Sequence, residues 1–147
     1  MQLDGNFIYL RPVQKEDLPF FVGWLSDSEV NQYTSGRSYS MQEECTWFES
    51  VQSNRDEMVF SIFLKSSNEI IGNCAIHFRQ QTEDAYAGKT SVGLMIGEKK
   101  EWGKGYGMDT VRTLLNYLKH EWGEREVYLT VFCENLGAHS MLRKMWV

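Results

Sequence analysis

The chain has 147 residues, 42% of them hydrophobic, with a formal net charge of −5 and an isoelectric point of about 5.2. This length favours a single domain over residues 1–147, with enough apolar side chains for a core. The acidic balance argues against broad non-specific binding to nucleic acid or to anionic membranes, although it allows a local basic pocket.

The same sequence indicates a cytoplasmic protein without a membrane partner. Residues 1–30 lack the basic start and apolar centre of a signal peptide, and no apolar run is long enough to span a bilayer. The three cysteines, Cys45, Cys74 and Cys133, are far apart and show no zinc-ligand spacing with one another or with histidines. We therefore expect reduced thiols and no metal site.

The first segments of the chain alternate between strand and helix patterns. Residues 7–13, "FIYLRPV", predict a strand, and residues 15–25 have apolar side chains at helical spacing after an acidic first turn. Residues 27–40 are polar and rich in turn formers, which predicts a loop or a broken helix. Ser40 and Glu43 then form a capping box ahead of a further helix.

The middle of the chain predicts a hairpin and one more strand. Residues 59–65 and 70–78 are rich in β-branched and aromatic side chains and flank a short polar turn, which is a hairpin pattern. A polar stretch, 80–89, separates the hairpin from residues 90–97, "TSVGLMIG", which predict a fourth strand.

The last part of the chain predicts an amphipathic helix, a fifth strand and a final helix. The apolar face of the first helix carries Val111, Leu114, Leu115 and Leu118. Residues 125–132 predict the strand, and residues 135–147 predict the last helix. Strands separated by helices imply an α+β or mixed α/β fold.

The segment "EKKEWGKGYG" places three glycines between a predicted strand and a predicted helix. Gly103, Gly105 and Gly107 permit positive φ angles and let another group approach the backbone closely. Their N–H groups, with the unpaired N–H groups of the following helix, can then bind a phosphate. Lys100 and Lys104 add positive charge nearby, and the alternative is a simple tight turn. A dinucleotide site and a Walker loop need other spacings.

Several segments together resemble the GCN5-related N-acetyltransferases (GNAT). "KEWGKG" matches the family motif Q/R-x-x-G-x-G/A with Lys in the first position, and "YLRPVQKEDLPFFVGWLSDSEVNQY" is similar to the opening of the RimJ/RimL-like branch. "IIGNCAIHF" resembles the third strand of the family, and "CENLGAHSMLRKM" resembles its Asn-containing strand end and last helix. The resemblance covers nearly the whole chain and implies a mostly antiparallel central sheet flanked by helices.

The resemblance also implies that acetyl-CoA is the acyl donor. The pantetheine arm would lie along the fourth strand, and the diphosphate would lie on the glycine run. The residues implied in binding acetyl-CoA are Leu94, Met95, Ile96, Lys100, Trp102, Gly103, Lys104, Gly105, Tyr106, Gly107 and Asn135. Trp102 and Tyr106 are alternatively packing aromatics, and Asn135 is alternatively a helix N-cap.

The family reaction is direct transfer of the acetyl group to an amine. A backbone N–H near Met95 would polarise the carbonyl, and a carboxylate would serve as the base. Many relatives carry Glu where Ser91 stands, so the candidate bases are Glu83 and its neighbour Asp84 in the preceding polar stretch. Ser140 is the candidate acid, because Leu142 stands where many relatives carry Tyr. The alternatives are a solvated loop position for Glu83 and Asp84 and a polar helix position for Ser140.

The acceptor implied by the family is a primary amine, either a protein N-terminus or a small molecule. Tyr33 and Tyr39 lie in the loop that lines the acceptor pocket of relatives, and the alternative is that both are surface aromatics. His77, on a predicted strand, is interpreted as a structural histidine. A CoA-binding sensor or interaction module without turnover is a second hypothesis, and a nucleotide-phosphate binder is a third.

The C-terminus departs from the family pattern. Relatives continue through a "K-x-G-F" element into two more strands, whereas this sequence ends at "KMWV". We therefore expect a truncated C-terminus, with the last strands of the sheet missing, or a homodimer in which another subunit supplies them. An unpaired edge strand would otherwise favour unwanted strand pairing.

Overall fold

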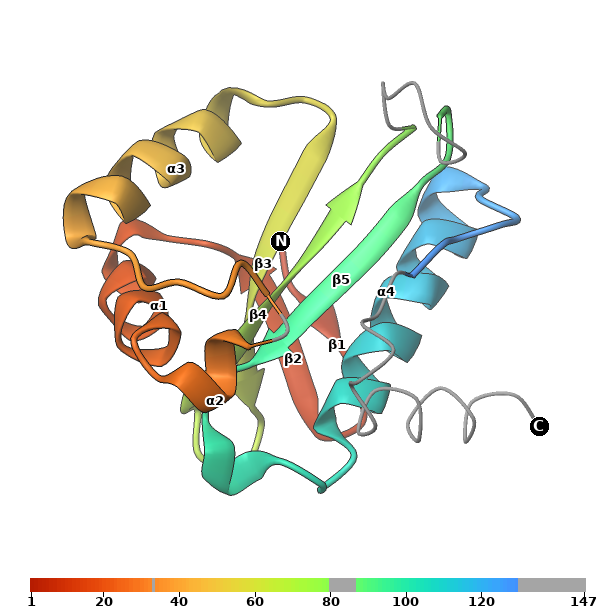
Figure 1. The fold of residues 1–147 in the computed structure, drawn as a ribbon. Helices are drawn as coiled ribbons and strands as arrows, with labels where there is room; N and C mark the ends of the chain where they lie inside the picture. Colours follow the sequence, from red (N-terminus) through yellow and green to blue (C-terminus); the bar gives the residue numbers. More distant parts are fainter. Residues whose placement is uncertain (33, 80–86, 130–147) are drawn as a thin grey trace.

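The computed structural model describes residues 1–32, 34–79 and 87–129, and in these residues five strands form one antiparallel sheet in the order β1-β2-β3-β4-β5 (Figure 1). The strands are β1 (Leu3–Asp4), β2 (Ile8–Pro12), β3 (Glu57–Leu64), β4 (Ile70–His77) and β5 (Ser91–Ile96). The helices are η1 (Lys15–Asp17), α1 (Leu18–Leu25), α2 (Ser28–Asn31), α3 (Met41–Ser53), η2 (Lys99–Glu101) and α4 (Tyr106–Trp122). The predicted mixed α/β fold is confirmed.

Most predicted elements lie within two residues of their observed bounds. The broken helix of residues 27–40 contains the one-turn helix α2, and the capping box of Ser40 and Glu43 begins α3. The two-residue strand β1 escaped prediction, because it carries too few residues to show a period. Of the predicted fifth strand, residues 125–129 are described, and they form no strand but a single bridge at Tyr128; the predicted last helix lies outside the described residues.

The sheet has helices on both faces (Figure 1). One face packs against α4, whose Leu114 and Leu118 are fully buried among alternate side chains of the strands. The other face packs against α1 and α3 through Phe21 and Val51. Each strand contributes alternate residues to the two faces, because successive side chains of a strand point to opposite sides of the sheet. None of the helices in the described ranges is both long and apolar enough to cross a bilayer.

The start of α4 is fastened to the β1–β2 turn by a buried carboxylate. Asp109, which is 7% exposed, accepts the backbone N–H groups of Asn6, Phe7 and Ile8 at 2.9, 2.8 and 3.1 Å. Hydrogen bonds to an ionised acceptor are stronger than neutral ones. A side chain at Gly5 would collide with this carboxylate, so glycine is required there. Asp109 therefore fixes the helix that follows the glycine run relative to the sheet.

Candidate functional site

Within residues 1–32, 34–79 and 87–129, one edge of β5 carries backbone groups that no neighbouring strand pairs. Val92 donates its N–H to the carbonyl of Tyr128, and Tyr128 donates to the carbonyl of Thr90, both at 3.0 Å. Because N–H and C=O groups alternate between the two edges of a strand, Leu94 and Ile96 also point their backbone groups to this edge. In the described ranges, the parallel pairing of residue 128 with β5 is a single bridge, to Ser91. The edge beyond it presents the N–H of Leu94.

The same alternation refines the expected role of Met95. Its backbone groups point toward β4, where Met95 lies opposite Asn73, and its side chain lines a cavity. Of the backbone N–H groups near Met95, that of Leu94 points to the edge of β5 away from β4. Trp102 occupies part of the free edge, because its indole N–H donates to the carbonyl of Ile96 at 2.7 Å.

The glycine loop, residues 102–105, has the backbone form of an anion nest. Gly103 and Gly105 have φ angles of 75° and 88°, and a Cβ at either would meet no atom within 4 Å. Gly105 is the N-cap of α4, and the N–H groups of the first helical turn have no intrahelical acceptor. Gly107 lies inside α4 and not in the turn, so it contributes only as one of these N–H groups. The loop thus offers open space to an anion at a positive helix end.

Cations surround the glycine loop. Lys100 and Lys104 lie 3.8 Å from Glu69 and 3.1 Å from Glu101, in pairs whose lysine side chains are more than half exposed. The Lys100–Glu69 pair is exposed on both sides and contributes little stability, so Lys100 can exchange its partner for a phosphate at small cost, whereas Lys104 is paired with the buried Glu101. Arg112, which the sequence analysis missed, joins Lys104 in lining a hollow of about 180 Å³ beside the loop.

The two aromatic side chains of this region differ in environment. Tyr106 packs against the core on the α4 face of the sheet, as the packing alternative predicts. Trp102 is 43% exposed, and its hydrogen bond to β5 holds its ring outside the core. Trp102 therefore offers more surface to a ligand on the loop than the partly buried Tyr106 does.

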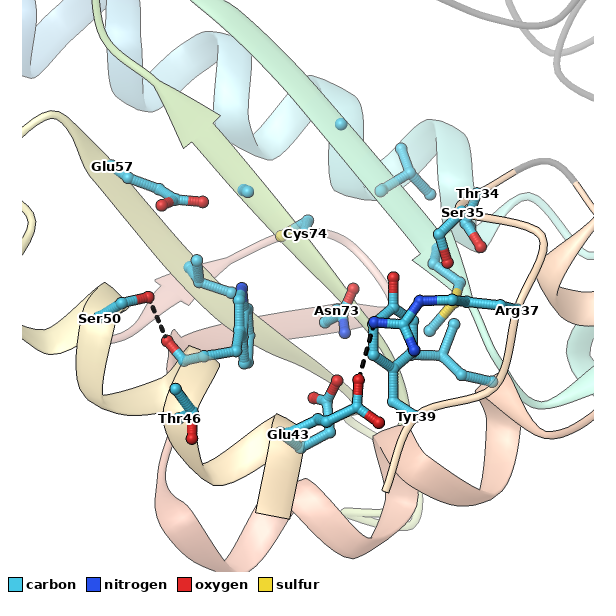
Figure 2. Close-up of a pocket in the computed structure, with 18 of the residues that line it drawn as sticks. Thr34, Ser35, Arg37, Tyr39, Glu43, Thr46, Ser50, Glu57, Asn73 and Cys74 are labelled. Atoms are coloured by element: carbon cyan, nitrogen blue, oxygen red, sulfur yellow. Dashed lines mark hydrogen bonds and ion pairs between the residues drawn. The ribbon is translucent and has the colours of Figure 1, made fainter. Parts of the chain in front are cut away.

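A cavity of about 850 Å³ lies on the other side of β5, between the sheet, α3 and the loop that precedes α3 (Figure 2). Alternate residues of β4, from Asn73 to His77, form its floor. Trp47 of α3 and Val59 of β3 add apolar surface. Tyr39 lines the cavity, whereas Tyr33 lies outside the described residues.

The rim of the cavity is held by an ion pair. Arg37 donates to Glu43 at 2.7 Å, and its guanidinium lies 3.8 Å from the ring centre of Tyr39 (Figure 2). The hydrogen bond from Arg37 holds the pKa of Glu43 below its ordinary value. Glu43 also closes the capping box with Ser40, so its charge is fully engaged at the start of α3.

A histidine and a glutamate face each other at the end of the cavity away from this rim. His77 Nδ1 lies 3.6 Å from Glu57 Oε1, because the hairpin register sets these residues opposite each other on β3 and β4. On its other side His77 lies opposite Ser91 of β5. His77 is therefore part of the cavity wall. The hairpin register was the signal that could have identified this pair.

A buried carboxylate faces the cavity from α3. Glu44 is 6% exposed and, in residues 1–32, 34–79 and 87–129, neither accepts a side-chain hydrogen bond nor forms an ion pair. Burial, reinforced by the charge of Glu43, raises the pKa of Glu44. Sequence analysis missed Glu44, because the local sequence does not show which of the adjacent residues Glu43 and Glu44 is buried.

Four further candidates, Glu83, Asp84, Asn135 and Ser140, lie outside the described residues and remain predictions. The described site therefore consists of the glycine loop, the free edge of β5 and the large cavity, joined through β5.

Comparison with known proteins relates this arrangement to acetyltransferases. Residues 8–145 match the family model for the acetyltransferase (GNAT) domain. The chain is 28% identical over 121 residues to an uncharacterized N-acetyltransferase of Bacillus licheniformis, and 22% identical over 125 residues to alpha/beta-tubulin-N-acetyltransferase 9 of Drosophila melanogaster. These matches cover 74% and 80% of this chain but only 60% and 62% of the two relatives.

Solved structures show the same fold. A GNAT-family acetyltransferase from Bacillus anthracis superposes with a TM-score of 0.80 at 17% identity, over 99% of this chain and 82% of that one. Spermidine N-acetyltransferase from Vibrio cholerae, solved with CoA and spermine, has a TM-score of 0.79 at 17% identity, over 93% and 78%. An aminoglycoside acetyltransferase solved with coenzyme A has a TM-score of 0.78 at 19% identity, over 93% and 82%.

Proposed function

The chain belongs to the GNAT acetyltransferase family, and from that premise we propose that it transfers the acetyl group of acetyl-CoA directly to a primary amine. One observation carries the proposal: a backbone anion nest, a free strand edge and a large cavity follow one another along β5. A long ligand that is anionic at one end and reactive at the other fits this order. The CoA-bound neighbours of the same fold support acetyl-CoA as that ligand.

The glycine loop would hold the diphosphate of acetyl-CoA. Its positive φ angles expose consecutive N–H groups, and a phosphate needs the space that no side chain fills at Gly103 and Gly105. Lys100 and Lys104 would neutralise part of the charge. The amides of the pantetheine arm would pair with Leu94 and Ile96 on the free edge of β5, as a further strand does.

The reaction needs a neutral amine near the thioester carbonyl. As the new C–N bond forms and the C–S bond breaks, the N–H of Leu94 would stabilise the charge on the carbonyl oxygen. His77 would accept the proton of the amine, and the carboxylate of Glu57, 3.6 Å away, would stabilise the resulting imidazolium. The thiolate of CoA is a good leaving group, since thiols ionise near pH 8.5. Glu83 is the alternative base.

The test is acetyl-CoA consumption by the chain with a panel of amines. Release of free thiol is followed for monoamines, diamines and a peptide with a free N-terminus, while calorimetry measures CoA binding separately. We expect CoA binding and thiol release with at least one amine. CoA binding without thiol release across the whole panel would contradict the proposal and favour a CoA-binding module.

A further inference from the structure

Glu44 is a charged group that the acetyl-transfer chemistry leaves unused. The residue is 6% exposed and lines the large cavity, and its carboxylate has no hydrogen-bonding or ionic partner in the described part of the chain, so its oxygens face only the cavity. Burial of an unpaired carboxylate is costly, and natural proteins rarely keep one without a function. A ligand that brings its own positive charge removes this cost when it binds.

The other charges of the cavity leave a negative surplus. Arg37 is the one lysine or arginine among the described residues that line it, and its ion pair with Glu43 cancels both charges at the rim. Glu44 and Glu57 remain, with Glu57 beside His77. The cavity therefore favours a cationic occupant at two places.

These two places are separated along the cavity. Figure 2 shows Glu43 beside Tyr39 at the rim, and Glu57 near Ser50 at the opposite end. Glu44 and Ser50 are six residues apart on α3, which is about 9 Å along the helix axis at 1.5 Å per residue. Trp47, between them on the helix, supplies apolar surface.

We propose that Glu44 binds a second cationic group of the acceptor, so that the acceptor is a diamine or polyamine whose reacting nitrogen lies at His77. The inference rests on the proposed acetyl transfer and specifies its acceptor. The carbon chain between the two nitrogens lies along Trp47 and Val59. The raised pKa of Glu44 is consistent with a poorly solvated carboxylate that has no counter-ion until a cationic ligand binds.

The kinetic test compares pentane-1,5-diamine with pentylamine in the chain and in two variants. Glu44→Gln keeps the shape of the side chain and removes its charge. Glu49→Gln is the matched control, because it makes the same change at an exposed glutamate of the same helix that does not line the cavity. We expect Glu44→Gln to lower the diamine-to-monoamine ratio of kcat/KM by about tenfold or more, the effect of one charged hydrogen bond. Equal ratios in the chain and in Glu44→Gln would overturn the inference.

A binding test separates this inference from the proposed function. Calorimetric titration of pentane-1,5-diamine into the CoA-free protein needs no turnover, and Glu44→Gln should weaken the binding by about tenfold while Glu49→Gln should not. Glu44-dependent diamine binding with no acetylation of any amine supports the subsite and contradicts the transferase. Acetylation of amines with diamine affinity unchanged in Glu44→Gln supports the transferase and contradicts the subsite.

Discussion

The glycine loop and the large cavity are built in different ways, although both border β5. The loop is one short segment of backbone, whose binding groups are N–H donors exposed by two positive φ angles. The cavity is assembled from side chains of α3, β3, β4 and β5, which lie far apart in the sequence. A binding site made of backbone groups can be recognised from a short sequence motif that a family shares, whereas a site made of side chains varies with each sequence. The loop therefore indicates the donor, and the cavity indicates the acceptor.

The largest expected effect comes from detaching the loop from its support without touching the cavity. Asp109→Asn removes the charge that three backbone N–H groups share and turns an amide donor toward at least one of them. We expect the free energy of unfolding to fall by about 3 kcal/mol in urea denaturation. Asp4→Asn, at an exposed acid 3.8 Å from Lys65, is the control and should change it by less than about 1 kcal/mol. Equal effects of the two variants would show that the hydrogen bonds of Asp109 do not stabilise the attachment of α4 to the β1–β2 turn.

The next effect tests the loop itself. Gly105→Val places a β-branched residue at a φ of 88°, which distorts the nest, and we expect CoA affinity measured by calorimetry to fall by about a hundredfold. Gly88→Val is the matched control, because Gly88 has a φ of 73° and equally open space but lies outside the loop. Both variants should lose about 1–2 kcal/mol of stability, and only Gly105→Val should lose affinity. Unchanged CoA binding in a folded Gly105→Val would refute the phosphate site.

The third prediction addresses the cavity and leaves the loop intact. His77→Ala should lower kcat by about a hundredfold, the usual contribution of a general base, while CoA affinity stays within about twofold. Glu57→Gln should lower kcat less, since Glu57 acts through His77. If kcat in His77→Ala equals that of the unmodified chain, the base lies elsewhere, and Glu83 becomes the residue to test.

The smallest expected effect is a difference between Glu43 and Glu44 of α3 in how substitution at each changes the pH dependence of stability. Burial raises the pKa of Glu44 in the folded state, so the folded state binds this proton more tightly than the unfolded state does. Ionised Glu44 therefore lowers stability above its folded pKa, and the penalty disappears below the unfolded pKa of about 4.3. Glu44→Gln should raise Tm by roughly 2–4 °C at pH 7 and not at pH 3.5.

Glu43 should behave in the opposite way. Arg37 lowers the pKa of Glu43, so its stabilising contribution is present above the unfolded pKa and is lost as the pH falls through the folded pKa. Glu43→Gln should therefore lower Tm slightly at pH 7 and have no effect in acid. A rise in Tm for both variants at pH 7 would mean that Glu44 is not distinguished by burial.

Local patterns predicted most of the fold and half of the site. The hairpin of β3 and β4, the capping box of Ser40 and the glycine turn before α4 each depend on residues within a few positions of one another. Such patterns express backbone preferences and hydrophobic period, which the sequence displays directly. The family motif adds the donor, because a backbone nest needs only glycines at the correct spacing.

Tertiary structure alone decided which polar side chains meet. Asp109 and Asn6 are 103 positions apart, and no local pattern links a carboxylate in α4 to N–H groups at the β1–β2 turn. The Glu57–His77 pair depends on the register of a hairpin with an irregularity between Ile62 and Phe63, and a shift of one residue would turn either side chain to the other face. Glu43 and Glu44 are the same residue type in the sequence, and only the packing of α3 on the sheet makes one exposed and paired, the other buried and alone.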